Sequence, residues 1–527
     1  MEISEPQYVT EDGSPNVALL QDRMPPHLQA SRPVVALATV LGFLFIFLSF
    51  RPLWHTDLWG HLSYGRWIWQ NGHLPVTEPL MPLSKGVPMI DTAWLSQLLG
   101  YGMITQFGPS GIQFLYALAI GIVMSLLTYA VYRRTGNPWA ALLTLAVFHW
   151  VEYHQLLIVR PQLAGMVCFA AIFTMATSAR WRGWYTWTIP VLFAIWANMH
   201  GSFLVGLVLL GGVLTGRAID VYRRTRDRRF VFADRTCRQL LIALELSAAA
   251  VLLNPYGLAI YPEVFAVAGS KNLEALVEWD PLTLRMKQGQ AAAVIALALI
   301  VMYRFTPRRV TMREVLLLCG YGALALWTSR MIVWWGPVAA YYLGLHTAAV
   351  WKSWSNRPAK EPVRGGMWTV VLLGLCWIFF AYTPFGSVAI HGRPTDEESQ
   401  FTELRRKTSS QTPVAIAEYL RKNPPQGQVF NAYEWGDYLT WAGPEGMQVF
   451  LNSHAHLVPE EVWQDYLETV HGSSDWSGNL NRYGVNAIIL DRMYRGDFIR
   501  KLEDTSSVWE KKYADNVGAV FYRKNPI

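Results

Sequence analysis

The sequence is dominated by apolar stretches long enough to cross a lipid bilayer. A bilayer core about 30 Å thick takes roughly 20 residues of helix, and the chain contains about eleven stretches near that length. They lie near 33–50, 111–132, 138–156, 161–179, 186–200, 202–219, 238–254, 289–305, 313–329, 331–350 and 366–384. Because lipid offers the backbone no hydrogen-bond partners, we expect an α-helical polytopic membrane protein.

Basic residues orient these stretches, because they cluster in every second connection. The clusters are Arg133 and Arg134; Arg180 and Arg182; VYRRTRDRRF (221–230); Arg304, Arg308 and Arg309; and Lys352, Arg357, Lys360 and Arg364. Cytoplasmic loops carry the excess of Lys and Arg. The N-terminus is therefore predicted to be cytoplasmic, and 51–109, 254–288 and everything after 385 extracytoplasmic. This topology accounts for the formal charge of +7, so nucleic-acid binding is not predicted.

Polar segments divide the chain into domains. Residues 1–32 are expected to be a disordered cytoplasmic tail. Residues 33–384 form the predicted transmembrane domain, and 385–412 have the composition of a linker. In 413–527, strand-like and helical patterns alternate, which predicts a small extracytoplasmic α/β domain with a largely parallel sheet.

One segment of the first external loop is ambiguous in length. WLSQLLGYGMITQFG (94–108) is apolar on one face but short and polar for a span. We expect it to lie as a helix in the membrane interface, because a span there would invert the basic-residue pattern.

The sequence indicates no cofactor and gives no support for a metal. The four cysteines lie in or beside apolar runs without metal-ligand spacing: Cys168, Cys237, Cys319 and Cys376. The C-terminal part has neither of the glycine-rich motifs that bind nucleotide phosphates.

The stretch WHTDLWGHLSYGRW (54–67) follows the first apolar run and carries several ionisable groups. Asp57 lies near the membrane boundary, where a charge is costly unless water, a partner or a substrate meets it. His55 and His61 can transfer protons, and Arg66 supplies a positive charge that can bind phosphate. Together they suit activation of a hydroxyl beside an anionic leaving group. In the alternative interpretation, Asp57 caps a helix that begins at Leu58.

Other charged residues stand at the same predicted outer level. Glu78 in PVTEPL and Asp91 in MIDTAW add carboxylates, although either can be a solvated loop charge. Arg160 in LLIVRPQL and Arg330 in LWTSRMIVWW stand near the outer ends of predicted helices. Such arginines either bind a substrate phosphate or reach lipid phosphates.

Three further residues are assigned to acceptor binding or to structure. Glu152 and His154 lie close to Arg160 in HWVEYHQ, and His200 occupies a tight turn in WANMHGSF. In the C-terminal part, four side chains are candidates for binding an acceptor glycan: Glu434, Asp437, His454 and His456.

The chain resembles bacterial integral-membrane glycosyltransferases of the GT-C superfold. The resemblance is to the group with a rhizobial lipopolysaccharide core glycosyltransferase-like domain, related to protein mannosyltransferases and aminoarabinose transferases. The stretches that carry it are DLWGHLSYGRWIWQNGHLPVTEP (57–79), MIDTAWLSQLL (89–99), RPQL (160–163), WANMHGSF (196–203), LLNPYG (252–257), FNAYEWGDYLTW (430–441) and VFLNSHAHLVPEEVWQDY (449–466).

The resemblance implies transfer of a sugar from a polyprenyl-phosphate-linked donor to a glycan, lipid or protein acceptor. The reaction would take place on the extracytoplasmic face of a bacterial cytoplasmic (inner) membrane. The family's first-loop acid, a general base or acceptor-positioning group, maps onto Asp57, and its second acid onto Glu78 or Asp91. Phosphate-binding residues map onto Arg160 and Arg330. Leu58 follows Asp57 where some relatives have a second acid, which weakens any claim for a divalent metal.

Other functions remain as alternatives. A polytopic transporter would carry ionisable residues at the bilayer midplane on broken helices, whereas here they gather at one face. An O-antigen polymerase or ligase would carry its large functional loop late in the chain. A non-catalytic membrane scaffold would leave the α/β domain as the working part.

Overall fold

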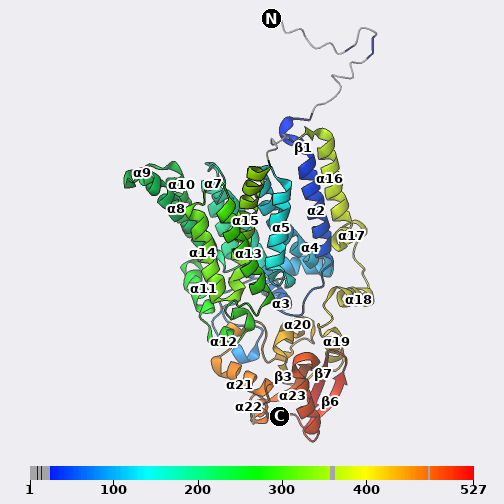
Figure 1. Cartoon of the computed structure of the whole chain (residues 1–527). Coiled ribbons are helices and arrows are strands. Elements are labelled where there is room, and N and C mark those ends of the chain that lie inside the picture. Colours follow the sequence, from blue (N-terminus) through cyan, green and yellow to red (C-terminus); the bar gives the residue numbers. More distant parts are fainter. Residues whose placement is uncertain (1–8, 10–12, 15–23, 356–361, 473–474) are drawn as a thin grey trace, which may run out of the picture.

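The structure, a computed structural model, describes residues 9, 13–14, 24–355, 362–472 and 475–527. It consists of a helical bundle with a sheet-containing domain at one end (Figure 1). The bundle contains α2 (Arg32–Ser49), α4 (Trp94–Thr135), α5 (Pro138–Glu152), α6 (Gln162–Ala176), α7 (Tyr185–Met199), α8 (Phe203–Thr225), α10 (Arg235–Val251), α13 (Lys287–Phe305), α14 (Met312–Trp327), α15 (Ile332–Trp354) and α16 (Gly366–Ala381).

Each apolar stretch noted in the sequence lies largely in one of these helices, which confirms the predicted helical membrane architecture. Within the described ranges, four helices are long and apolar enough to cross a membrane by themselves: α2, α4, α8 and α13. A fifth candidate is α16 together with α17 (Pro384–His391), two helices bent by 86°. The remaining bundle helices are shorter or more polar, so the count of about eleven spans stays a prediction.

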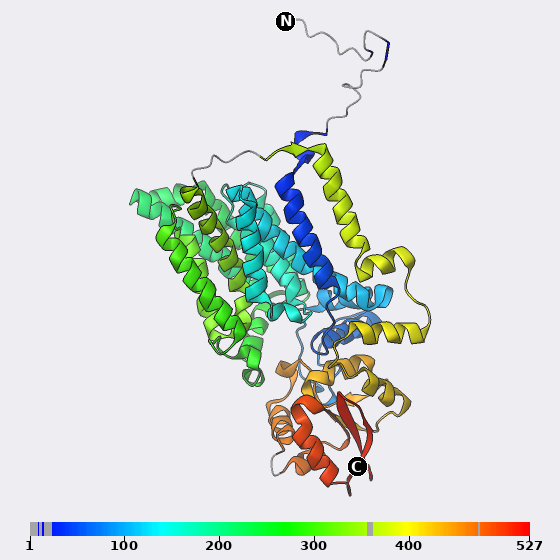
Figure 2. The same ribbon diagram turned by 45° about the vertical axis from the view of Figure 1, so that its right-hand side comes forward.

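The helices α2 and α16 at one edge of the bundle are joined at their N-terminal ends by a pair of short strands. The short strands β1 (Ala30–Ser31) and β2 (Arg364–Gly365) pair antiparallel just before α2 and α16. These helices then run side by side (Figure 2). Most of the predicted tail at 1–32 lies outside the described residues, but its end contains η1 (Pro26–Leu28) and β1.

The predicted interface helix at 94–108 is the first part of α4. The helix is broken at Gly108, whose backbone has φ 63° and ψ −160°, and Pro109 follows. Glycine adopts this positive φ without strain, and proline can begin the next helical turn. One long element therefore carries both the loop segment and the following apolar stretch.

Smaller elements form the loops that the sequence predicts to be external. The first loop contains α3 (Leu58–Asn71) and η2 (Pro82–Ser84). The loop after α10 contains η4 (Gly257–Ala259), α11 (Ile260–Ala268), α12 (Lys271–Glu274) and η5 (Val277–Trp279). Three further short elements connect the bundle: α9 (Arg228–Ala233), η3 (Gln155–Leu157) and η6 (Ser329–Met331).

The C-terminal domain is built around a five-stranded sheet with the order β4-β3-β5-β7-β6. Its strands are β3 (Gln428–Asn431), β4 (Gln448–Val449), β5 (Val485–Asp491), β6 (Trp509–Ala514) and β7 (Gly518–Arg523). The surrounding helices are α19 (Val414–Lys422), η7 (Tyr433–Trp435), α20 (Gly436–Ala442), η8 (Ala455–Leu457), α21 (Glu460–Val470), α22 (Trp476–Arg482) and α23 (Arg492–Asp504). The prediction of an α/β domain is confirmed.

The expectation of a largely parallel sheet is wrong. β3 pairs parallel with β4 and β5, but β7 pairs antiparallel with both β5 and β6. Only residues 515–517 separate β6 from β7, and so short a connection can join only antiparallel strands. The prediction of a largely parallel sheet did not include this hairpin.

The predicted linker at 385–412 is partly helical, since it contains most of α17 and all of α18 (Glu397–Lys407). Beyond it, α20 docks on α3 of the first loop. Trp59 and Tyr438 pack edge to face with ring centroids 5.1 Å apart. Arg66 donates hydrogen bonds to the backbone carbonyls of Thr440 and Trp441. The C-terminal domain is thereby fixed against the end of the bundle at which α3 lies.

Candidate active site

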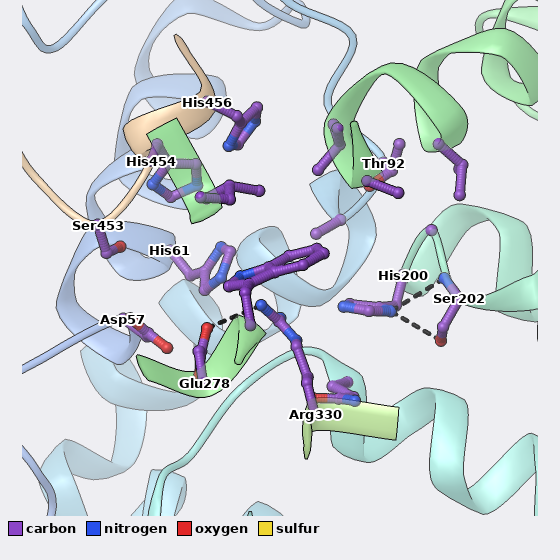
Figure 3. Close-up of a pocket in the computed structure, with 18 of the residues that line it drawn as sticks. Asp57, His61, Thr92, His200, Ser202, Glu278, Arg330, Ser453, His454 and His456 are labelled. Carbon is purple, nitrogen blue, oxygen red and sulfur yellow. Dashed lines mark hydrogen bonds and ion pairs between the residues drawn. The ribbon is translucent and has the colours of Figure 1, made fainter. Parts of the chain in front are cut away.

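A cavity of about 250 Å³ lies where the first loop, the adjoining helix ends and the C-terminal domain meet (Figure 3). Its polar lining includes Asp57, His61, Asp91, Glu278, Arg330 and His454. These residues are far apart in sequence and come from five elements or loops. The fold therefore brings together the ionisable groups of several predicted external segments.

Asp57 immediately precedes α3 and has an unusual backbone. Its φ of 48° and ψ of −60° make it one of two non-glycine residues with positive φ in the described ranges. Such a conformation costs energy and persists only where the surroundings enforce it. The Asp57 side chain makes no capping hydrogen bond to α3. Its carboxylate instead forms an ion pair with Arg160, so the capping interpretation does not describe its contacts.

Asp57 stands at one end of a row of alternating charges. Arg160 contacts the Asp57 carboxylate through Nε, and its Nη1 lies 2.7 Å from Oε2 of Glu278. Oε1 of the same glutamate lies 2.9 Å from Nη1 of Arg330. Arg330 also packs over the ring of Trp279 at 5.4 Å. The two arginines predicted to bind phosphate are thus bridged by one carboxylate.

The sequence prediction missed Glu278. It sits in η5, in the loop between α10 and α13, and nothing in the short motif VEWD distinguishes it from a solvated loop acid. Burial by itself would raise the Glu278 pKa, but the guanidinium groups of Arg330 and Arg160 lower it. Burial would lower the Arg160 pKa, and the carboxylates of Asp57 and Glu278 raise it instead. Glu278 and Arg160 are therefore both charged at neutral pH.

Asp91 is the third carboxylate in the cavity wall, after Asp57 and Glu278. Its Oδ1 accepts hydrogen bonds from the backbone N–H of Ala93 and from Nε2 of Gln97, both at 3.0 Å. Its Oδ2 is buried without a hydrogen-bond partner. Burial raises the Asp91 pKa to about 7, although the two hydrogen bonds act in the opposite direction. An acid with this pKa can exchange a proton near neutral pH.

His61 lies beside Asp91 because both contact the same glutamine. Nε2 of Gln97 is 3.2 Å from Nδ1 of His61. Burial lowers the His61 pKa to about 4, against the opposing charge of Asp57. The imidazole is therefore neutral at pH 7 and offers a hydrogen-bonding group rather than a charge.

Glu78, the alternative to Asp91, is held away from the cavity. Its Oε2 accepts a hydrogen bond from the hydroxyl of Tyr64 at 2.6 Å. Its Oε1 accepts from the backbone N–H groups of Leu80 and Met81. Both carboxylate oxygens are thus occupied in shaping the loop. Of the two acids that the sequence left open, Asp91 is the one that faces the cavity.

Five other predicted residues have different surroundings. His200 lines the cavity and hydrogen-bonds Ser202. Arg66 binds backbone carbonyls of the C-terminal domain and is not among the cavity residues. His55 is close to Ser409, and burial lowers its pKa. Glu152 is buried at the end of α5 beside Gly336, and His154 follows that helix exposed to solvent.

The C-terminal domain supplies one wall of the cavity. Tyr433, Ser453, His454 and His456 line it, and these residues follow the carboxyl ends of the parallel strands β3 and β4. That edge is where open α/β sheets usually bind ligands. Burial lowers the pKa of His454 strongly and that of His456 to about 4. This wall therefore presents neutral imidazoles.

The two acidic candidates of this domain lie apart from each other. Glu434 forms an ion pair with Arg495 at 2.8 Å and does not line the cavity. Asp437 is fully buried on α20, and its Oδ2 accepts a hydrogen bond of 2.6 Å from the backbone N–H of Asp57. Burial and the nearby Asp57 carboxylate raise the Asp437 pKa to about 7.

An apolar groove of about 330 Å³ adjoins the polar cavity. The two share His61 and Gln97 in their walls. Side chains of α3, α4, α6 and α7 line the groove, and Arg160 is part of its wall. Several of its apolar residues are partly exposed, including Leu118, Ile122 and Ile195. Among the described residues, no three His, Cys, Asp or Glu side chains are arranged to hold a metal ion.

Comparisons with known proteins identify the fold. No protein-family model and no curated protein matches the chain. The apo oligosaccharyltransferase of Archaeoglobus fulgidus is similar with a TM-score of 0.53 at 10% identity, over 89% of this chain and 70% of that chain. ArnT from Cupriavidus metallidurans bound to undecaprenyl phosphate gives 0.51 at 13%, over 93% of this chain and 97% of that chain.

A third solved structure agrees with these two. The arabinofuranosyltransferase AftD from Mycobacteria gives a TM-score of 0.51 at 16% identity, over 94% of this chain and 40% of that chain. All three are membrane glycosyltransferases of the GT-C superfold. The resemblance noted in the sequence is thus confirmed at the level of the fold, and the chain has the GT-C fold.

Proposed function

We propose that this protein is a membrane glycosyltransferase that moves a sugar from a polyprenyl-phosphate-linked donor to a hydroxyl group of a glycan, lipid or protein. The observation that carries the proposal is the junction of two unlike cavities. A polar cavity with carboxylates and guanidinium groups meets an apolar groove, with Arg160 beside their shared wall. A phosphate attached to a long apolar chain has these two chemistries at one junction.

In the proposed reaction the acceptor oxygen forms a bond to the anomeric carbon. The bond from that carbon to the phosphate oxygen breaks, and polyprenyl phosphate leaves with the bonding electron pair. Asp57 takes the acceptor proton, and Asp91 orients the acceptor through its unpartnered oxygen. Arg330 and Arg160 stabilise the charge that develops on the phosphate.

Glu278 has a defined part in this scheme. Its carboxylate already binds both arginines, so a donor phosphate must share or replace these contacts. Until then the glutamate holds the two guanidinium groups in position, which reduces the cost of ordering them when the donor arrives. The basic loops described above support an extracytoplasmic site in a bacterial cytoplasmic membrane.

The test is donor consumption by purified protein in nanodiscs. A panel of undecaprenyl-phosphate-linked sugars is offered with acceptor glycans, and released undecaprenyl phosphate is measured. We expect Asp57→Asn to lower the rate by about 100- to 10,000-fold, the usual contribution of a general base. Asp280→Asn is the matched control, because Asp280 is an exposed acid in the neighbouring external loop.

Two outcomes would count against the proposal. Near-normal turnover by Asp57→Asn removes Asp57 from the role of base. If the wild-type protein neither binds nor consumes any member of the panel, the transporter and scaffold alternatives gain instead.

A further inference from the structure

The least expected contact of the candidate site comes from a different domain. The backbone N–H of Asp57 donates a hydrogen bond of 2.6 Å to Oδ2 of Asp437, which lies 380 residues later in the chain. Asp437 is fully buried. A buried carboxylate needs hydrogen-bond donors, and this one finds one of them at the predicted catalytic residue.

The backbone at Asp57 requires such a partner. With φ at 48°, Asp57 adopts a backbone conformation that is disfavoured for residues other than glycine. Its carbonyl is occupied by the N–H of His61 in the first turn of α3. The hydrogen bond to Asp437 fixes the N–H of Asp57, so both the N–H and the carbonyl of this residue have partners.

The packing around Asp437 leaves no room for a side chain at Gly60 of α3. A Cβ atom added at Gly60 of α3 would lie 2.3 Å from Oδ1 of Asp437, so only glycine allows this approach. The same oxygen accepts a hydrogen bond from the backbone N–H of Ser453 at 3.3 Å. Asp437 therefore links α20, the loop after β4 and the start of α3.

We infer that Asp437 is a positioning residue: the C-terminal domain sets the backbone geometry of Asp57 and so completes the catalytic site. This inference rests on the proposed role of Asp57. In the helical bundle without the C-terminal domain, the backbone N–H of Asp57 would lack the Asp437 carboxylate as its hydrogen-bond acceptor. The domain then has a function in the chemical step in addition to any contact with the acceptor.

The main test compares Asp437→Ala and Asp437→Asn in the full-length protein in nanodiscs. Asp437→Ala removes the acceptor atom, and we expect kcat to fall about 100-fold, as for a small displacement of a reacting group. The donor KM and the binding of undecaprenyl phosphate should change less than about twofold, because the arginines and the groove are intact. Asp437→Asn keeps an oxygen for the Asp57 N–H and should recover most of the loss.

Trp441→Leu is the matched control for domain docking. Trp441 lies on the same helix, one turn beyond Asp437, and packs near Trp59 and Arg66 without contacting Asp57. The control should leave kcat within about threefold of wild type. Equal losses in Asp437→Ala and Trp441→Leu would show that docking alone matters, and would overturn the inference.

A double-mutant cycle with Gly60→Ala gives a second readout from the α3 side. The added methyl group would displace the Asp437 carboxylate, so Gly60→Ala should also lower kcat. Because its effect acts through that carboxylate, the Gly60→Ala/Asp437→Ala double variant should be no slower than Asp437→Ala alone. Additive losses would contradict the inference.

Backbone hydrogen exchange at residues 54–62 separates failure of this inference from failure of the proposed function. Exchange should rise in Asp437→Ala and stay near wild type in Trp441→Leu, whatever donor the protein uses. Unchanged exchange in Asp437→Ala overturns the positioning role. Absence of turnover in the wild type, with increased exchange in Asp437→Ala, refutes only the proposed reaction.

Discussion

The polar cavity and the apolar groove meet at His61 and Gln97 but are built by opposite means. Charged side chains from loops and helix ends, among them Glu278 and Arg330, line the cavity. Side chains of α3, α4, α6 and α7, nearly all apolar, line the groove. The cavity depends on tertiary contacts between distant segments, whereas the groove depends on helix faces. One ligand with a phosphate head and an apolar tail would use both, and the two can be perturbed separately.

The largest separate effect is expected from the side of the cavity that we propose binds phosphate. Arg330→Gln removes a guanidinium group but leaves Glu278 paired with Arg160, so no buried carboxylate loses its only partner. We expect kcat/KM to fall about 100- to 1000-fold, as when a transition-state hydrogen-bond donor is removed. The measurement is initial rate against donor concentration in nanodiscs.

Arg285→Gln is the control for this loss of charge, since Arg285 is exposed in the same loop as Glu278. If both variants lose activity equally, general attraction of an anionic donor explains the result. A specific contact of Arg330 with the phosphate would then be contradicted.

The groove should respond differently to a bulky substitution. Ala164 of α6 lines the groove, and Ala164→Phe would fill part of it. We expect kcat/KM for an undecaprenyl-linked donor to fall about 10- to 100-fold, corresponding to a steric cost of a few kcal/mol. A donor with a short, water-soluble prenyl chain should be turned over nearly as well as by wild type.

Ala293→Phe on α13 is the matched control, because Ala293 is half-buried and lines neither space. Equal losses with long and short donors in Ala164→Phe would mean that the groove does not hold the lipid chain. The distinction between head and tail sites would then fail.

The sequence predicted the parts of this arrangement that depend on local pattern. The apolar stretches predicted the helices, and the exit of the first stretch directed attention to Asp57. Arg160 and Arg330 were noticed because an arginine at a helix end is unusual among apolar residues. Each of these signals is contained in a short window of sequence.

The missing parts depend on contacts between windows. Glu278 became recognisable only once the fold brought it between two arginines. Asp437 had no signal that related it to Asp57, since a hydrogen bond to a backbone N–H leaves no residue pattern. Likewise, Arg66 has the sequence context of a site residue, but its partners are backbone carbonyls of a distant helix.

The two acids that the sequence left open provide a smaller and sharper test of the cavity. Asp91→Asn alters the acceptor side and should lower kcat about 10- to 100-fold without reducing stability, because the amide oxygen can still accept from Ala93 and Gln97. Glu78→Gln should instead reduce stability and leave activity unchanged. It cannot satisfy all three of its donors, so we expect a loss of about 1–3 kcal/mol of stability and normal activity per folded molecule. Thermal unfolding and active-site-normalised rates distinguish the two, and a reversed pattern would exchange their roles.

A further expected effect is a pH dependence of stability that comes from Asp91 in the cavity. Burial raises the Asp91 pKa from 3.8 to about 7 in the folded protein, so between these values the folded state keeps a proton that the unfolded state has lost. The contribution of Asp91 to stability is therefore present at low pH and is lost as the pH rises towards 7. The Asp91→Asn variant does not lose stability in this way. Burial also raises the pKa of Asp437, but Asp437 is present in both the variant and the wild type, so its contribution cancels. The Tm of the variant relative to wild type should increase from pH 4 to pH 7 and then level off. A constant Tm difference between variant and wild type across this range would mean that water or an ion solvates the Asp91 carboxylate. Asp91 would then titrate like an acid on an exposed loop.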